Sequence, residues 1–118
     1  MLFHVIKIGD KEYKCSLTMK SLVAAEKRIG ENPLNMLMAV SDGGLPSFEK
    51  MMILFHESLQ KYQHNINMDE AYDLYDSYVA DGNSFAEFMA ELINIFKASG
   101  IIQEDKKSKK GKVNNEKN

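Results

Sequence analysis

Residues 17–34 read LTMKSLVAAEKRIGENPL and contain the beginning of one helix, its end, and the beginning of a second helix. Thr18 is a favourable N-cap because its hydroxyl can accept a hydrogen bond from an unpaired amide of the first turn. Gly30 can end the helix, since glycine enters the left-handed C-cap conformation without a Cβ clash. Asn32 as a cap and Pro33 at the first helical position then begin the next helix.

One charged residue interrupts the apolar stripe of the first of these helices. At helical spacing the stripe comprises Met19, Leu22, Val23 and Ile29, and Glu26 falls within it. A carboxylate on an apolar face is costly unless it is paired. Glu26 therefore either meets a partner inside the fold or lies where another chain docks, which makes it a candidate partner-binding residue.

Length and composition indicate one folded domain. The chain has 118 residues, of which 44% are hydrophobic, and its net charge of −2 does not point to nucleic acid or a membrane surface as a partner. Cys15 is the single cysteine, which excludes an internal disulfide and any multi-cysteine zinc site. No apolar run approaches the roughly 20 residues that span a bilayer. We expect a cytoplasmic protein.

The remaining pattern predicts an α+β fold, with an N-terminal β-hairpin packed on about five mostly amphipathic helices. Strands are expected over residues 2–8 and 12–17, around a short loop at Gly9-Asp10-Lys11. After the helix over residues 19–29, further helices are expected over residues 33–40, 47–63, 67–80 and 84–99, the last two beginning with capping boxes. Residues 1–103 form the single predicted domain.

Residues 104–118 differ in character from the rest of the chain. They hold six lysines against three acidic residues, a charge of +3, so the preceding residues carry −5. Val113 is their single apolar residue, too little to offset the entropy of ordering the segment. We expect a disordered basic tail.

Three sets of side chains are candidate contact surfaces. Ile53 is expected to point away from the core stripe of its helix, which comprises Phe48, Met51, Met52, Phe55, Leu59 and Tyr62. Met36 and Met38 lie on the short second helix, where methionine either fills the core or forms an adaptable contact surface. Asp69, Asp73 and Asp76 form an acidic stripe that is either a solvated face or a dock for a basic surface, such as the lysine tail.

No catalytic, cofactor-binding or metal-binding motif is present in the sequence. His56 and His64 are eight residues apart and do not form the adjacent-turn pair that zinc enzymes use. The sequence contains no glycine-rich phosphate loop and no nucleophile elbow. We therefore expect a protein that is not an enzyme and needs no cofactor.

Several short motifs resemble the tail assembly chaperones of long-tailed (siphovirus-like) phages and prophages. In the first part of the chain they are IGDKEY at residues 8–13, LT at 17–18, EKRIG at 26–30 and NPL at 32–34. Further along they are LPS at residues 45–47, LQKYQH at 59–64, YVADG at 78–82 and SG at 99–100. The likeness covers residues 5–102.

This resemblance implies a binding role without enzymatic activity. Chaperones of this family bind the tape measure protein, keep it soluble and help tail tube subunits to polymerise around it. The expected partners are thus the tape measure protein, the tail tube protein and further copies of the chain, in the host cytoplasm rather than in the mature virion. The alternative is a small DNA-associated regulatory protein that uses its basic C-terminal tail.

Overall fold

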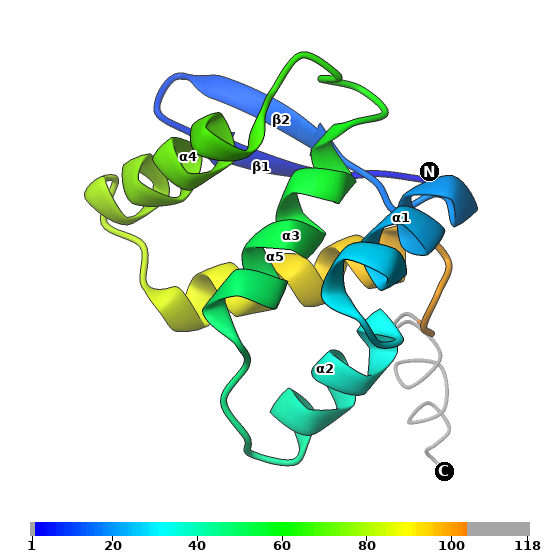
Figure 1. The fold of residues 1–118 in the computed structure, drawn as a ribbon. Coiled ribbons are helices and arrows are strands. Elements are labelled where there is room, and N and C mark those ends of the chain that lie inside the picture. The colour runs from blue at the N-terminus through cyan, green and yellow to red at the C-terminus, as the bar shows by residue number, and fades with distance from the viewer. Residues whose placement is uncertain (1, 104–118) are drawn as a thin grey trace, which may run out of the picture.

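The computed structural model describes residues 2–103, which form a β-hairpin followed by five helices (Figure 1). The predicted α+β class is therefore confirmed. The elements are β1 (His4–Ile8), β2 (Lys11–Cys15), α1 (Met19–Ile29), α2 (Pro33–Ser41), α3 (Phe48–Leu59), α4 (Met68–Ala80) and α5 (Phe85–Ala98). The predicted basic tail, residues 104–118, lies outside the described residues.

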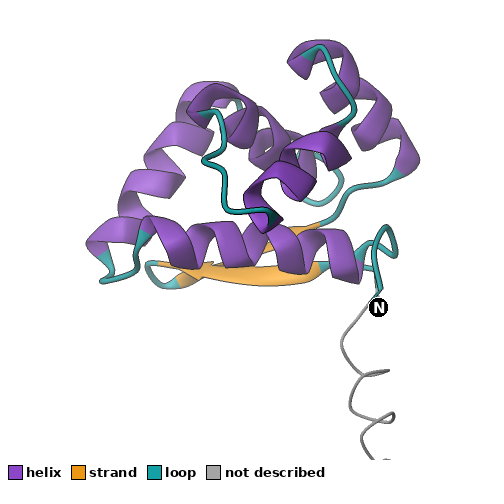
Figure 2. Ribbon diagram, turned by 90° about the horizontal axis from the view of Figure 1, so that it is seen from below, coloured by secondary structure: helices purple, strands orange, loops and turns teal. Residues whose placement is uncertain are grey.

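The hairpin is antiparallel and tighter than the sequence predicts. Its register runs from His4 opposite Cys15 to Ile8 opposite Lys11, so two residues form the turn. Gly9 has a φ of 66°, the left-handed conformation that two-residue hairpin turns require. The hairpin lies along one side of the molecule, where α5 and α4 contact β1 and α3 contacts β2 (Figure 2).

The local signals for the boundaries of α1 and for the beginnings of α4 and α5 are confirmed. Thr18 caps α1 by accepting a hydrogen bond from the Ser21 amide at 3.1 Å, and Gly30 ends this helix in the left-handed conformation. Both predicted capping boxes form, Asn67 with Glu70 before α4 and Ser84 with Glu87 before α5. These boundaries were predictable because each cap is an interaction between residues close in sequence.

The third helix ends at Leu59, four residues earlier than predicted, and the Gln63 side chain beyond its end bonds to the hairpin. Gln63 Oε1 accepts a hydrogen bond from the Lys14 amide of β2 at 2.8 Å, and Gln63 Nε2 donates to the Lys14 carbonyl at 2.9 Å. The side-chain amide thus satisfies an outward-facing peptide group of the strand. It covers part of the outer edge of β2.

The core is centred on α3 and α5. Phe88 of α5 is fully buried and makes edge-to-face contacts with Phe55, Tyr75 and Tyr78, at centroid distances of 5.0, 4.9 and 5.6 Å. The helix α3 contacts α1, α4 and β2, so it is surrounded rather than packed on one face. Its buried residues are Met51, Met52, Ile53, Leu54, Phe55, Ser58 and Leu59.

Candidate functional site

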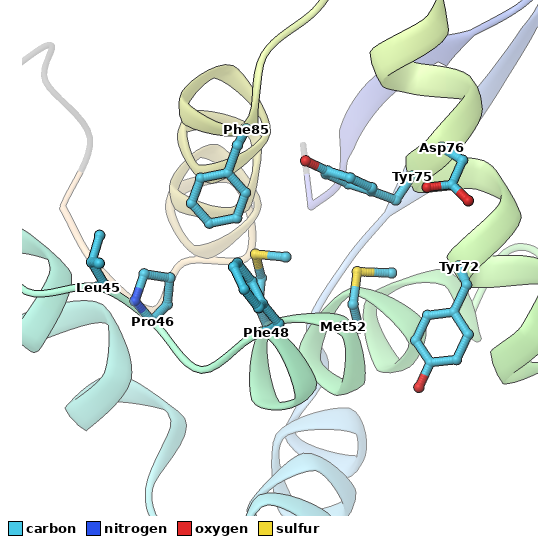
Figure 3. Close-up of a pocket in the computed structure, with 9 residues that line it drawn as sticks. Leu45, Pro46, Phe48, Met52, Tyr72, Tyr75, Asp76 and Phe85 are labelled. Atoms are coloured by element: carbon cyan, nitrogen blue, oxygen red, sulfur yellow. The ribbon is translucent and has the colours of Figure 1, made fainter.

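An open apolar groove lies between the beginning of α3, the middle of α4 and the beginning of α5 (Figure 3). Its volume is about 650 Å³. We call it the aromatic groove and define it by its lining residues: Leu45, Pro46, Phe48, Met51, Met52, Tyr72, Tyr75, Asp76 and Phe85.

Large apolar side chains of this groove are open to solvent. Leu45 is 90% exposed, Phe48 71% and Tyr72 43%. Single exposed apolar residues are ordinary, but a contiguous set that lines a hollow is typical of an interaction site.

The floor and walls of the groove combine a fixed part with adaptable side chains. The rings of Phe48 and Phe85 meet edge to face, with centroids 5.6 Å apart and an interplanar angle of 86°. Met51 and Met52 are buried beneath the opening, and thioether side chains can repack against partners of different shape. In Figure 3, Leu45 and Pro46 flank one end of the groove, and Tyr72 and Asp76 flank the other.

The loop before α3 presents the first of these side chains, and two glycines make this possible. Gly43 has a φ of 93°, which favours glycine, and the Gly44 amide donates to the Ala39 carbonyl at 2.8 Å. A Cβ at Gly44 would lie 2.9 Å from that carbonyl oxygen, so the close approach requires a residue without a side chain. The chain turns sharply after α2 and leaves Leu45 projecting.

The acidic stripe on α4 is exposed along its length, and one of its members lines the groove. Asp69, Asp73 and Asp76 are all exposed, but Asp76 is the one beside Tyr72 and Tyr75. Within residues 2–103, no hydrogen bond or ion pair engages the Asp76 carboxylate. This end of the groove therefore carries an unpaired negative charge.

Glu26 lies in a second, smaller hollow, which we call the α1 groove. Its lining residues are Leu17, Met19, Leu22, Val23, Glu26, Asn32, Pro33, Leu34, Ser99, Gly100 and Ile101. Glu26 is exposed, and the part of the chain that the structure describes supplies no hydrogen-bonding or ion-pair partner for its carboxylate. Of the two alternatives for Glu26, the structure thus excludes an internal partner among residues 2–103.

Two candidate contact residues are buried: the expected exposure of Ile53 is wrong, and Met36 takes the core-filling alternative. Ile53 is 8% exposed and belongs to the core, because α3 packs on more than one side, against α1, α4 and β2. Met36 is 7% exposed and belongs to the core, whereas Met38 on the same helix is 64% exposed. The predicted adaptable surface on α2 is therefore limited to Met38.

The opposite error concerns Phe48, which the periodicity assigned to the core. Phe48 is the first residue of α3, where the neighbouring elements leave it open, and it forms a wall of the aromatic groove. The predicted core residue Tyr62 is also exposed, because it follows the end of the helix. Leu45 and Phe48 flank a Pro-Ser pair that follows two glycines. Large apolar residues in such a loop were the sequence signal that could have indicated an exposed contact surface.

Two titratable groups outside the grooves have pKa values raised by burial. Burial, reinforced by the hydrogen bond to Glu91, raises the pKa of the Tyr78 hydroxyl above its usual range. Burial also raises the pKa of the Cys15 thiol to about 12, so the reactive thiolate is suppressed at neutral pH. Among residues 2–103, no three His, Cys, Asp or Glu side chains gather as a metal site would require.

Residues 3–118 match a family of unknown function, DUF6096, and the chain therefore belongs to this family. No curated protein and no solved structure matches the chain significantly. Within the described residues, none of the helices is long and apolar enough to cross a membrane.

Proposed function

We propose that this member of the DUF6096 family is a phage-type tail assembly chaperone, which binds the tape measure protein, keeps it soluble and assists tail tube polymerisation. The observation that carries the proposal is the aromatic groove, an exposed apolar surface built on helices of the folded domain. The motif resemblance over residues 5–102 supports the same role.

The groove suits the apolar face of a helical client. Helix-in-groove recognition places side chains at i, i+3 or i+4, and i+7 into an elongated hydrophobic hollow. The exposed rings of Phe48 and Tyr72 offer broad, rigid contact area, and Met51 and Met52 allow the floor to adjust. Such a surface can hold successive segments of one long client, which differ in detail but share apolar faces.

A small domain covers a long client only if many copies bind side by side. We therefore expect self-association through a surface distinct from the client groove. The α1 groove is the candidate surface for self-association, because it contains the exposed Met19 and the unpaired Glu26. Light scattering of the isolated chain should show concentration-dependent oligomers, which the Glu26→Lys variant weakens.

Co-expression with the tape measure protein tests the chaperone role. We expect the client to stay in the soluble fraction with the wild-type chain and to sediment with the double variant Leu45→Ser, Phe48→Ser. Leu2→Ser is the matched control, because Leu2 is also a large exposed apolar residue but lies outside the groove.

A client that is equally soluble without this chain would overturn the proposal. A client that remains soluble with the double groove variant would show that the aromatic groove is not the client-binding surface. Salt-sensitive DNA binding by the same preparation would favour the DNA-associated alternative.

A further inference from the structure

We infer that the aromatic groove selects helices that carry a lysine or arginine beside their apolar residues, and that Asp76 pairs with this cation and sets the direction in which the helix lies. The inference rests on the proposed function only in taking the client to be helical. It concerns the charge and orientation of the client segment.

Asp76 is the charged group of the site. Among the nine described residues that line the groove, it alone carries a charge, and its carboxylate is exposed and unpaired within residues 2–103. Tyr72 precedes it by four residues, so the two side chains share one face of α4. An exposed aromatic ring beside a carboxylate attracts a cation by two routes, ion pairing and cation–π contact.

When a helix covers the groove, the Asp76 carboxylate influences which helices bind. An apolar helix that fills the hollow removes water from the surroundings of Asp76, and an unpaired charge in a drier environment is penalised. A cation on the helix compensates this penalty, whereas a neutral residue leaves it and a carboxylate adds repulsion. Asp73 and Asp69 continue the negative potential along α4 and favour the same sign of partner.

The position of Asp76 gives the groove a direction. In Figure 3, Asp76 and Tyr72 lie at the end opposite Leu45 and Pro46. A helix with its cation beyond one end of its apolar residues can satisfy Asp76 in one orientation only. Copies that bind client segments with the same arrangement of apolar residues and cation would therefore all point the same way.

Designed helical peptides test the inference on the full chain. Each labelled 18-residue peptide carries leucines at i, i+3 and i+7, and one test residue, lysine, glutamine or glutamate, one turn beyond the last leucine. A fourth peptide has the lysine one turn before the first leucine. Dissociation constants are measured by fluorescence anisotropy for the wild type, Asp76→Asn and the control Asp69→Asn, which alters an exposed aspartate of α4 outside the groove.

We expect the wild type and Asp69→Asn to bind one of the two lysine peptides about five- to tenfold more tightly than the glutamine peptide, the range of a single partly desolvated ion pair. The glutamate peptide should bind more weakly still, and Asp76→Asn should abolish the preference. Thermal melts of the two variants should match the wild type, because both aspartates are exposed.

Three outcomes would overturn the inference. Equal affinity for the lysine and glutamine peptides, with binding still lost in Phe48→Ser, would refute charge selection and leave the client groove intact. Equal affinity for the two lysine peptides would refute directionality. Binding of no peptide, together with a dimer that Phe48→Ser dissociates, would show that a second copy occupies the groove and would count against the proposed function as well.

Discussion

The Tyr78 hydroxyl of α4 donates a hydrogen bond to Glu91 Oε2 of α5 at 2.9 Å. The other carboxylate oxygen of Glu91 lies 2.6 Å from His4 Nε2 of β1. One carboxylate thus links two helices and the hairpin. Because α4 and α5 also form walls of the aromatic groove, this link helps to fix the width of the groove.

Removing the Tyr78 hydroxyl should destabilise the fold. The hydroxyl is the donor to a half-buried carboxylate, so Tyr78→Phe should lower the free energy of unfolding by about 1–2 kcal/mol in urea denaturation. Tyr72→Phe on the same helix is the control and should change it by less than about 0.5 kcal/mol, since Tyr72 is exposed. Equal stability of both variants would show that the bond contributes nothing.

Truncation of two phenylalanines should lower the free energy of unfolding to very different extents. Phe88→Ala removes the ring that three aromatic side chains surround and should cost about 3–5 kcal/mol of unfolding free energy. Phe48→Ala should cost less than about 1 kcal/mol, because its ring is mostly exposed. A large loss of stability in Phe48→Ala would mean that the ring stabilises the fold and is not free to bind a partner.

Glu26→Gln should leave the folded monomer unchanged. The carboxylate is exposed and has no ion-pair partner among the described residues, so we expect a change in unfolding free energy below about 0.5 kcal/mol. Urea denaturation at a concentration where the chain is monomeric measures this. A loss of 1 kcal/mol or more would point to a partner for Glu26 within the fold.

Alkaline pH should destabilise the protein through Cys15. Burial raises the pKa of this thiol to about 12, whereas an unfolded thiol titrates near 8.5. The stabilising contribution is therefore fully present below about pH 8.5 and is lost as the pH rises toward 12, because the unfolded state releases its proton first. Urea denaturation between pH 8 and pH 10.5 should show a free energy of unfolding that decreases with pH.

The Cys15→Ala variant is the control for that slope. It lacks the ionisable group, so its stability should fall less steeply over the same pH range even though its absolute stability is lower. Identical slopes in the two proteins would assign the pH dependence to other groups. In the native wild type, Cys15 should also react with an aromatic disulfide reagent only after denaturation, since it is fully buried.

Sequence alone determined where most elements begin and end. The cap at Thr18, the left-handed Gly30 and the two capping boxes involve residues within four positions of one another, so their chemistry is readable without a fold. The prediction placed the end of α3 four residues too late, and the Gln63 side chain beyond it bonds to Lys14, a residue 49 positions away that no local pattern connects to it.

Only the tertiary structure decided which side chains are available to a partner. Periodicity assumes that a helix has one covered face, but α3 is enclosed by α1, α4 and the hairpin, so Ile53 is buried. Phe48 shares the core stripe of α3 and is nevertheless mostly exposed, because it is the first residue of the helix and lines the open groove. The acidic stripe was readable from spacing, yet the position of Asp76 in an apolar groove depends on how α3, α4 and α5 meet. Burial is a property of the whole packing arrangement, and no local sequence pattern encodes how many elements surround a given face.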